Sequence, residues 1–221
     1  MPDRLEPEVM AMLVAREFRD GDIINLGVGL GAICCDYVSP DIEVLFHSEQ
    51  GLLGYGAMIT DPAQADPNVR SMAGFVQALP GMSFMSHDES FDLVNGGRLS
   101  ITVLGGLQVD QEGNLANNTR PGRITGSLGG AGDLATHAKQ TIVMMTHTSA
   151  SGEPKILKQC TLPLTGTRCV DLIVTDIAVM RVAGGEIIVQ EYAPGWTFDE
   201  IQKLTEARLT PAPDMREASL V

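Results

Sequence analysis

Apolar side chains recur with two different periods along the chain, and the period in each stretch predicts the element that forms there. Residues 6–19 carry them at helical spacing, with Pro7 suited to the first turn and Gly21 to the end. Residues 22–31 ("DIINLGVGLG") then run from a short apolar stretch into a glycine-rich turn, and residues 32–38 ("AICCDYV") follow with a helical pattern. The first forty residues therefore predict a helix, a strand, a turn and a second helix.

The next stretch places one acidic residue at the end of a predicted strand. Residues 42–47 ("IEVLFH") have the composition of a strand that ends just before Glu49. Residues 58–72 contain two Asp-Pro steps and are expected to form a surface loop. Ser86, followed three residues later by Glu89, has the pattern of a capping box, so we predict that a helix begins there.

The second half of the chain continues this order of strands, turns and helices. Its predicted elements are a buried strand with a glycine break at 99–110, a loop at 112–123, a glycine turn leading into a helix at 126–139, a strand at 141–148, strands at 169–193 that turn at Gly184-Gly185, and a helix at 197–209 that starts with a capping box of Thr197 and Glu200. Residues from about 208 to 221 are expected to form a loose tail.

Strands that alternate with helices predict an α/β fold, with a mostly parallel open sheet flanked by helices. The length of 221 residues and the apolar share of 44% fit a single domain over residues 1–221. In such sheets, ligands bind beyond the carboxyl ends of the strands. Three glycine-rich turns are expected at such places, at residues 27–31, 51–56 and 126–132.

Charge and targeting signals narrow the class of partner. The net charge is −13, from 15 basic and 28 acidic side chains, and an acidic surface repels a phosphate backbone, so we expect no nucleic-acid partner. The N-terminus has no apolar stretch of the signal-peptide type, and the run "VMAMLVA" is too short to span a bilayer. We therefore expect a soluble cytoplasmic protein with no membrane partner.

The cysteines do not predict a metal site. Cys34, Cys35, Cys160 and Cys169 form no CxxC pair and have no metal-ligand spacing with the four histidines. We expect four free thiols in a reducing compartment, with no bound metal.

Glu49 lies in the sequence between two glycine-rich stretches, at residues 27–31 and 126–132. Glycines let backbone N–H groups approach a ligand closely, but neither stretch has the Walker A pattern, residues 27–31 fail the G-x-G-x-x-G spacing, and each is also what a tight turn requires. A carboxylate in this place is a base, a metal ligand, a nucleophile or a solvated residue at the end of a strand. Spacing alone favours the solvated residue and leaves the chemical roles open.

Seven blocks along nearly the whole chain match a known family in order and at compatible spacing. They are "NLGVG" (25–29), "SEQGLLGYG" (48–56), "PGMSFMSHDESF" (80–91), "LGGLQVDQEGNLAN" (104–117), "GGAGDL" (129–134), "GEPKILKQCTLPLTG" (152–166) and "CVDLIVTDIAV" (169–179). On these blocks the chain resembles the B (beta) subunit of family I CoA-transferases, the group that includes 3-oxoacid and 3-oxoadipate CoA-transferases. The resemblance implies the CoA-transferase fold over residues 1–221.

The resemblance also implies a mechanism and a partner. The family's nucleophile is the glutamate of a Ser-Glu-Asn-Gly motif, which falls on Glu49, and it attacks an acyl-CoA to give a mixed anhydride and then a glutamyl-CoA thioester. Coenzyme A is thus a substrate held by a transient covalent bond, and no permanently bound cofactor is implied. Family members pair an A (alpha) subunit with B, so we expect a heterodimer or an A2B2 assembly with the site against A.

Each candidate site residue has an expected role under this resemblance. The expected roles are catalysis for Glu49; oxyanion and CoA binding for Asn25, Gly27, Gly29, Gly129 and Gly130; support for Ser48, Gln50 and Gly51; and anion contact for Arg120 and Arg123. The contact of the two arginines would be with a substrate carboxylate or a CoA phosphate, and solvated loop cations are the simpler interpretation. His47 is expected on the same side of its strand as Glu49.

Two departures from the family pattern bear on specificity. Gln50 stands where the family usually has Asn, and Asn118 and Thr119 stand where it often has Trp and an aliphatic residue. The more polar loop suggests a different acyl group. Two alternatives to a transferase also remain, a non-catalytic module that senses an acyl-CoA or sugar phosphate, and an acyl-CoA hydrolase on the same scaffold.

Overall fold

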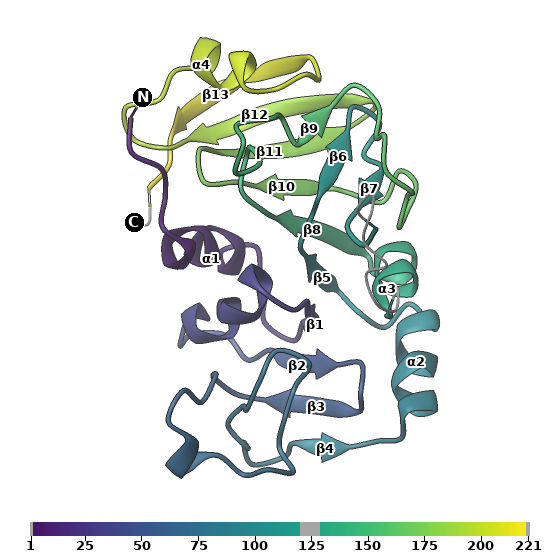
Figure 1. Ribbon diagram of the computed structural model, residues 1–221. Coiled ribbons are helices and arrows are strands. Elements are labelled where there is room, and N and C mark those ends of the chain that lie inside the picture. Colours follow the sequence, from purple (N-terminus) through teal and green to yellow (C-terminus); the bar gives the residue numbers. More distant parts are fainter. Residues whose placement is uncertain (1, 120–128, 220–221) are drawn as a thin grey trace.

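A large sheet forms the centre of the molecule (Figure 1). The computed structural model describes residues 2–119 and 129–219. Within these ranges, ten strands form one sheet in the order β13-β12-β11-β10-β8-β5-β1-β2-β3-β4, and three short strands form a second in the order β7-β6-β9. The strands are β1 (Ile23–Leu26), β2 (Leu45–Ser48), β3 (Leu52–Tyr55), β4 (Ser83–Phe84), β5 (Ile101–Leu104), β6 (Gln108–Asp110), β7 (Leu115–Ala116), β8 (Gln140–Met144), β9 (Ile156–Leu157), β10 (Leu172–Val174), β11 (Ala178–Ala183), β12 (Glu186–Tyr192) and β13 (Leu209–Glu217).

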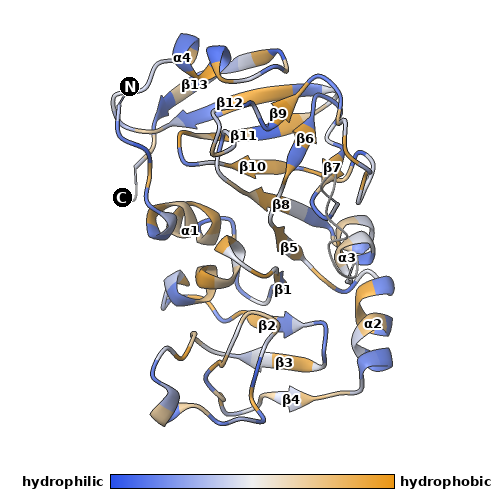
Figure 2. Ribbon diagram, viewed as in Figure 1, coloured by the Kyte–Doolittle hydropathy of each residue, from blue (hydrophilic) through white to orange (hydrophobic). Residues whose placement is uncertain are grey.

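The five central strands β10-β8-β5-β1-β2 are parallel to one another, whereas the pairs within β2-β3-β4 and within β10-β11-β12 are antiparallel. Every residue of β5 and β10 is buried, as expected for parallel strands covered on both faces. Figure 2 shows hydrophobic residues concentrated on these inner strands. The predicted α/β class with a mostly parallel sheet is therefore confirmed.

Helices cover the sheet on both faces. They are α1 (Pro7–Ala15), the 3-10 helices η1 (Leu30–Tyr37) and η2 (Pro62–Gln64), α2 (His87–Asn95), α3 (Ala131–His137) and α4 (Phe198–Lys203). Buried residues of α1 and η1 share one core cluster with β1 and β2, while buried residues of α2, α3 and α4 share a second cluster with β8, β10 and the small sheet. Both predicted capping boxes are present, at the start of α2 and of α4.

The ends of three early elements differ from the prediction. Helix α1 is shorter than residues 6–19, because after Ala15 the backbone continues in i→i−3 turns in which the N–H of Phe18 donates to the carbonyl of Ala15. Residues 30–37 form a 3-10 helix rather than an α-helix, and Cys34 and Cys35 are buried within it. Residues 51–56, predicted as a glycine-rich turn, contain β3, which folds back on β2 as a hairpin.

Two later segments are more ordered than predicted. The predicted loop 112–123 contains β7, because a turn in which the N–H of Gly113 donates to the carbonyl of Asp110 (2.9 Å) folds the chain back along β6. The prediction of a loose tail from about residue 208 was wrong, because β13 pairs with β12 and Leu209 is buried. Prolines are tolerated there because β13 is an edge strand, which needs N–H donors on one side only.

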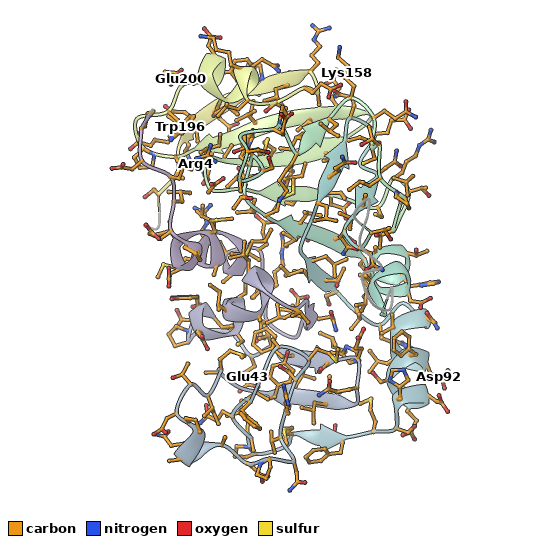
Figure 3. The ribbon with its side chains drawn as sticks, in the orientation of Figure 1. Arg4, Glu43, Asp92, Lys158, Trp196 and Glu200 are labelled. Atoms are coloured by element: carbon orange, nitrogen blue, oxygen red, sulfur yellow. The ribbon has the colours of Figure 1, made fainter. Side chains whose placement is uncertain are left out.

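The segment before α1 is fixed against the turn after β10 and the residues just before α4. The Arg4 guanidinium forms an ion pair with Asp176 (2.8 Å) and lies over the ring of Trp196 at 5.8 Å, as Figure 3 shows for Arg4 and Trp196. Within the described residues, no helix is both long enough and apolar enough to cross a membrane.

Candidate active site

A cavity of about 410 Å³ opens beyond the carboxyl ends of β1, β2 and β5, where ligand binding is expected in a parallel sheet. It is lined by Asn25, Leu26, Gly27, Val28, Ser48, Glu49, Met72, Leu104, Gly105, Gly106, Leu107, Asn117, Asn118, Gly129, Gly130, Ala131 and Leu134. Glu49 is the one ionisable side chain among these described lining residues. The fold therefore brings the predicted nucleophile and glycines from both glycine-rich stretches to one place.

Glu49 is presented by a tight turn. The N–H of Gly51 donates to the carbonyl of Ser48 (2.9 Å), so residues 48–51 reverse the chain directly after β2. Gly51 has φ +110°, and an added Cβ would collide with the carbonyl oxygen of Met85. The sequence needs a glycine here for the turn to form, which explains the Glu-Gln-Gly order after the strand.

The Glu49 carboxylate is half-buried and is held by the backbone of the second glycine stretch. The N–H of Gly130 donates to Glu49 Oε2 at 3.1 Å, and Gly129 has φ +55°. An added Cβ on Gly130 would lie well inside 3.0 Å of Oε2 and 2.7 Å from Phe91 Cζ. Only a glycine at this position lets the backbone approach the carboxylate so closely.

A buried chain of polar side chains lies next to the turn that carries Glu49. Asn25 Nδ2 donates to His47 Nδ1 (3.1 Å) and to the His47 carbonyl (3.2 Å), and His47 Nε2 lies 2.9 Å from Ser90 Oγ. Because Nδ1 accepts from an amide, the proton of the neutral ring is assigned to Nε2, which donates to Ser90. Burial lowers the pKa of His47 to about 4, so the ring is neutral at pH 7.

The residues that flank Glu49 hold the neighbouring loop. Ser48 Oγ accepts a hydrogen bond from the N–H of Met72 (3.3 Å), and Gln50 Nε2 donates to the carbonyl of Arg70. Both bonds hold residues 70–72 against the turn that carries Glu49. This geometry gives Ser48 a supporting contact, and it gives the longer Gln50 side chain a partner outside the cavity.

Sequence comparison identifies the family. A sequence model described as Coenzyme A transferase matches residues 8–204 of the chain. The chain belongs to the coenzyme A transferase family. It is 40% identical over 205 residues to the beta subunit of a probable coenzyme A transferase of Bacillus subtilis (92% of this chain, 94% of the relative). It is also 40% identical over 214 residues to the acetate CoA-transferase beta chain of Haemophilus influenzae (96% and 95%) and over 203 residues to the B chain of 3-oxoadipate CoA-transferase of Pseudomonas putida (91% and 95%).

Solved structures agree with this CoA-transferase assignment at the level of the fold. An acyl-CoA transferase from Escherichia coli O157:H7, solved as a thioester complex with CoA, superposes with a TM-score of 0.74 at 21% identity. All of this chain is covered, but it spans only 44% of that longer chain. Glutaconate CoA-transferase from Acidaminococcus fermentans gives a TM-score of 0.70 at 19% identity, with 97% of this chain and 89% of that chain covered.

The residues predicted to bind the oxyanion and CoA differ in which partner their N–H groups contact. Gly130 donates to Glu49, but the N–H of Gly27 is already used by the carbonyl of Val103 (2.7 Å). The amide of Asn25 directs its N–H groups at His47, and Gly29 does not line the cavity. Asn25 and Gly27 therefore line the cavity without directing these N–H groups into it, whereas the N–H of Gly130 donates to the Glu49 carboxylate.

Several lining residues of the CoA-transferase cavity were missed from the sequence. Gly105 and Gly106 follow β5 and line the cavity, and the glycine break within residues 99–110 was the signal that could have located them. Val28 and Met72 carry no recognisable signal, since single apolar residues in loops are common. Arg120 and Arg123 lie outside the described residues.

Neither metal nor thiol chemistry gains support from the described side chains. Within residues 2–119 and 129–219, no three His, Cys, Asp or Glu side chains are grouped so as to hold a metal ion. Burial, with a smaller contribution from Asp36, raises the pKa of the Cys35 thiol to about 12, and burial raises that of Cys169 to about 11. These thiols are protonated at pH 7 and are poor nucleophiles.

Proposed function

We propose that this chain is the B half of a two-part CoA-transferase that moves CoA from an acyl-CoA to a carboxylic acid, of the 3-oxoacid type, through a glutamyl-CoA thioester at Glu49. One observation carries the proposal. The carboxylate of Glu49 lies in a glycine-lined cavity at the carboxyl ends of the parallel strands, with a backbone N–H donor 3.1 Å from Oε2.

The reaction balances with no group other than the two substrates. A Glu49 oxygen attacks the thioester carbonyl, the C–S bond breaks, and CoA leaves as its thiolate, which gives a mixed anhydride. The thiolate then attacks the Glu49 carbonyl and the donor acid leaves as a carboxylate that carries one Glu49 oxygen. In the second half, the acceptor carboxylate attacks the glutamyl thioester, and the same steps run in reverse.

Gly130 has a defined part in this sequence. When the thiolate attacks the Glu49 carbonyl, negative charge develops on a carboxyl oxygen of Glu49 itself. The Gly130 N–H already contacts Oε2 at 3.1 Å, so it stabilises that oxyanion without reorganisation. Removal of one such donor costs roughly 10²–10³ in rate in other enzymes.

Substrate class is proposed from the relatives and from the loop after β7. The relatives include chains of acetate and 3-oxoadipate CoA-transferases, which are acid and 3-oxoacid enzymes by name. In this chain Asn117 and Asn118 line the cavity, and amide groups are suitable hydrogen-bond partners for a 3-oxo group. This polar loop favours an acyl chain with an oxygen beyond the thioester.

The A partner is proposed from the open side of the cavity. Val28 is 61% exposed and Met72 is 47% exposed, and both line the cavity. Relatives of nearly the same length are named as the beta or B component of their enzymes. An A subunit that covers these apolar side chains would complete the site, as a heterodimer or an A2B2 assembly.

The test is a trapped intermediate. The chain is mixed with its A partner and an acyl-CoA, without an acceptor acid, and the intact mass is measured. We expect a CoA-sized increase that borohydride removes as it reduces Glu49 to an alcohol, and none in Glu49→Ala or Glu49→Gln. A Glu49→Ala variant that still transfers CoA would refute the nucleophile, and steady release of free CoA and acid without an adduct would indicate a hydrolase.

A further inference from the structure

Helix α2 contacts the nucleophile turn and the oxyanion donor, although none of its residues lines the cavity. His87 Nδ1–H donates to the backbone carbonyl of Glu49 at 3.1 Å. The ring of Phe91 lies against Gly130, where an added Cβ would be 2.7 Å from Cζ. On the opposite side of the helix, Asp92 points away from the sheet (Figure 3). One face of α2 is therefore directed at the catalytic groups.

The third contact of α2 is the buried one. Ser90 is fully buried and accepts from Nε2 of His47 at 2.9 Å, and His47 in turn accepts from Asn25 on β1. His47 has an exposure of 0% and stands two residues before Glu49. The ring is thus held from the helix on one side and from the neighbouring strand on the other.

Packing alone does not account for a histidine at this position. An unpaired polar group costs free energy when buried, whereas an apolar side chain of similar size fills the same space at no such cost. Hydrogen bonds, unlike apolar contacts, fix orientation as well as distance. A polar chain beneath the last residues of β2 is therefore suited to fixing where the following turn places the Glu49 carboxylate.

We propose that His47 is the positioning residue for the nucleophile, and that α2 acts on the site through the Ser90–His47–Asn25 chain. The inference rests on the proposed function of Glu49 and adds the residue that orients it. His47 does not line the cavity, so it takes no direct part in bond making. Its effect is on the geometry of attack, where a misplacement of about 1 Å can cost 10²-fold in rate.

The chain contains a matched control for this proposal. His147 is also 0% exposed and is also held by two side chains, in its case the hydroxyls of Thr175 (3.0 Å) and Thr205 (2.8 Å), and it too has a pKa that burial lowers to about 4. It does not line the cavity. His147→Gln therefore perturbs a buried hydrogen-bonded histidine of the same kind away from the nucleophile.

The experiment measures the rate of thioester formation per folded enzyme, in the complete A and B assembly with acyl-CoA, by quenched mass spectrometry. The variants are His47→Gln, Ser90→Ala and the double variant, with His147→Gln as the control. We expect a loss of about 10²-fold for His47→Gln and about 10-fold for Ser90→Ala, with KM nearly unchanged. The double variant should lose less than the product of the two single losses, because both act through one hydrogen bond.

The possible outcomes separate the positioning role of His47 from the proposed function of Glu49. If the wild type forms the thioester and the folded fractions of His47→Gln and Ser90→Ala react at the wild-type rate, the positioning role is refuted and the proposed function stands. Equal losses for His47→Gln and His147→Gln also refute it, since they indicate a general effect on stability. No thioester in the wild type refutes the proposed function together with the inference. Ser90→Ala removes only one hydroxyl group. If His47→Gln does not fold, the rate of thioester formation in Ser90→Ala therefore tests the positioning role.

Discussion

The close approach of Gly130 to Glu49, the proposed nucleophile, can be tested with one added methyl group. In Gly130→Ala the new Cβ would lie well inside 3.0 Å of Glu49 Oε2, which is closer than real Cβ atoms come, and 2.7 Å from Phe91 Cζ. The carboxylate must therefore move by roughly 1 Å, and a displacement of that size costs about 10² in rate. The same shift breaks the 3.1 Å hydrogen bond from the Gly130 N–H. We expect kcat to fall by roughly 10²–10³, with a small change in KM for the acyl-CoA.

The control is Gly132, two residues further on, which lies in the helix α3 that Gly130 precedes. At Gly132 an added Cβ has no heavy atom nearer than the Thr165 carbonyl oxygen at 3.6 Å, so Gly132→Ala fits. Alanine is favoured over glycine in a helix by about 1 kcal/mol, so this variant should be as stable as the wild type or more so. Steady-state kinetics and thermal melts of both variants provide the comparison. A Gly130→Ala enzyme with wild-type kcat would show that the carboxylate position seen here is not the reactive one.

Protonation, oxygen transfer and anion contact give three further predictions. Burial lowers the pKa of His47 and of His147 from 6.5 to about 4, so between these pH values the unfolded chain binds protons that the folded chain does not. The free energy of unfolding should therefore fall as the pH drops from 6.5 to 4, by about 3 kcal/mol per histidine. Urea midpoints at pH 7, 5.5 and 4 measure this, and His147→Gln should flatten the curve. With an ¹⁸O-labelled acceptor carboxylate, one label should pass through Glu49 to the released donor acid, and mass spectra that show only water oxygen would exclude the anhydride route. Arg120→Ala and Arg123→Ala should each raise KM for an anionic substrate by roughly 10-fold with kcat retained, if the arginines contact it, and unchanged constants would mark them as solvated.

The fold could be predicted where local pattern and tertiary environment agree. The buried runs of β5 and β10, and the capping boxes of α2 and α4, each carry their own signal within a few residues. The sequence of β13 gave a misleading signal, because Pro211 and Pro213 are typical of a loose tail. Whether a proline is tolerated in a strand depends on which side of it has a neighbour, and that is a property of the sheet order.

The site could be predicted only as far as its motifs reach. Glu49 and Gly130 were found through the blocks that resemble the family, and the structure brings them within hydrogen-bond distance although 81 residues separate them. The contacts of His87 with Glu49 and of Ser90 with His47 had no comparable signal. Each joins residues about 40 positions apart, and the short sequence pattern that contains them predicts only the start of a helix.

Exclusion of water from the cavity would favour the proposed CoA transfer over hydrolysis of the acyl-CoA. The anhydride and the thioester proposed at Glu49 would react with any water that reached them, so the proposed transferase must keep this carboxylate dry through two half-reactions. Within the described part of the chain Glu49 is only half-buried, and exposed apolar side chains of Val28 and Met72 line the cavity. Apolar surface is stabilised when a partner covers it, so the same contact that binds an A subunit would also remove water from the nucleophile. Assembly and chemical selectivity would then depend on one surface, and this is a physical reason for an enzyme of this kind to be divided into two parts that meet at the site.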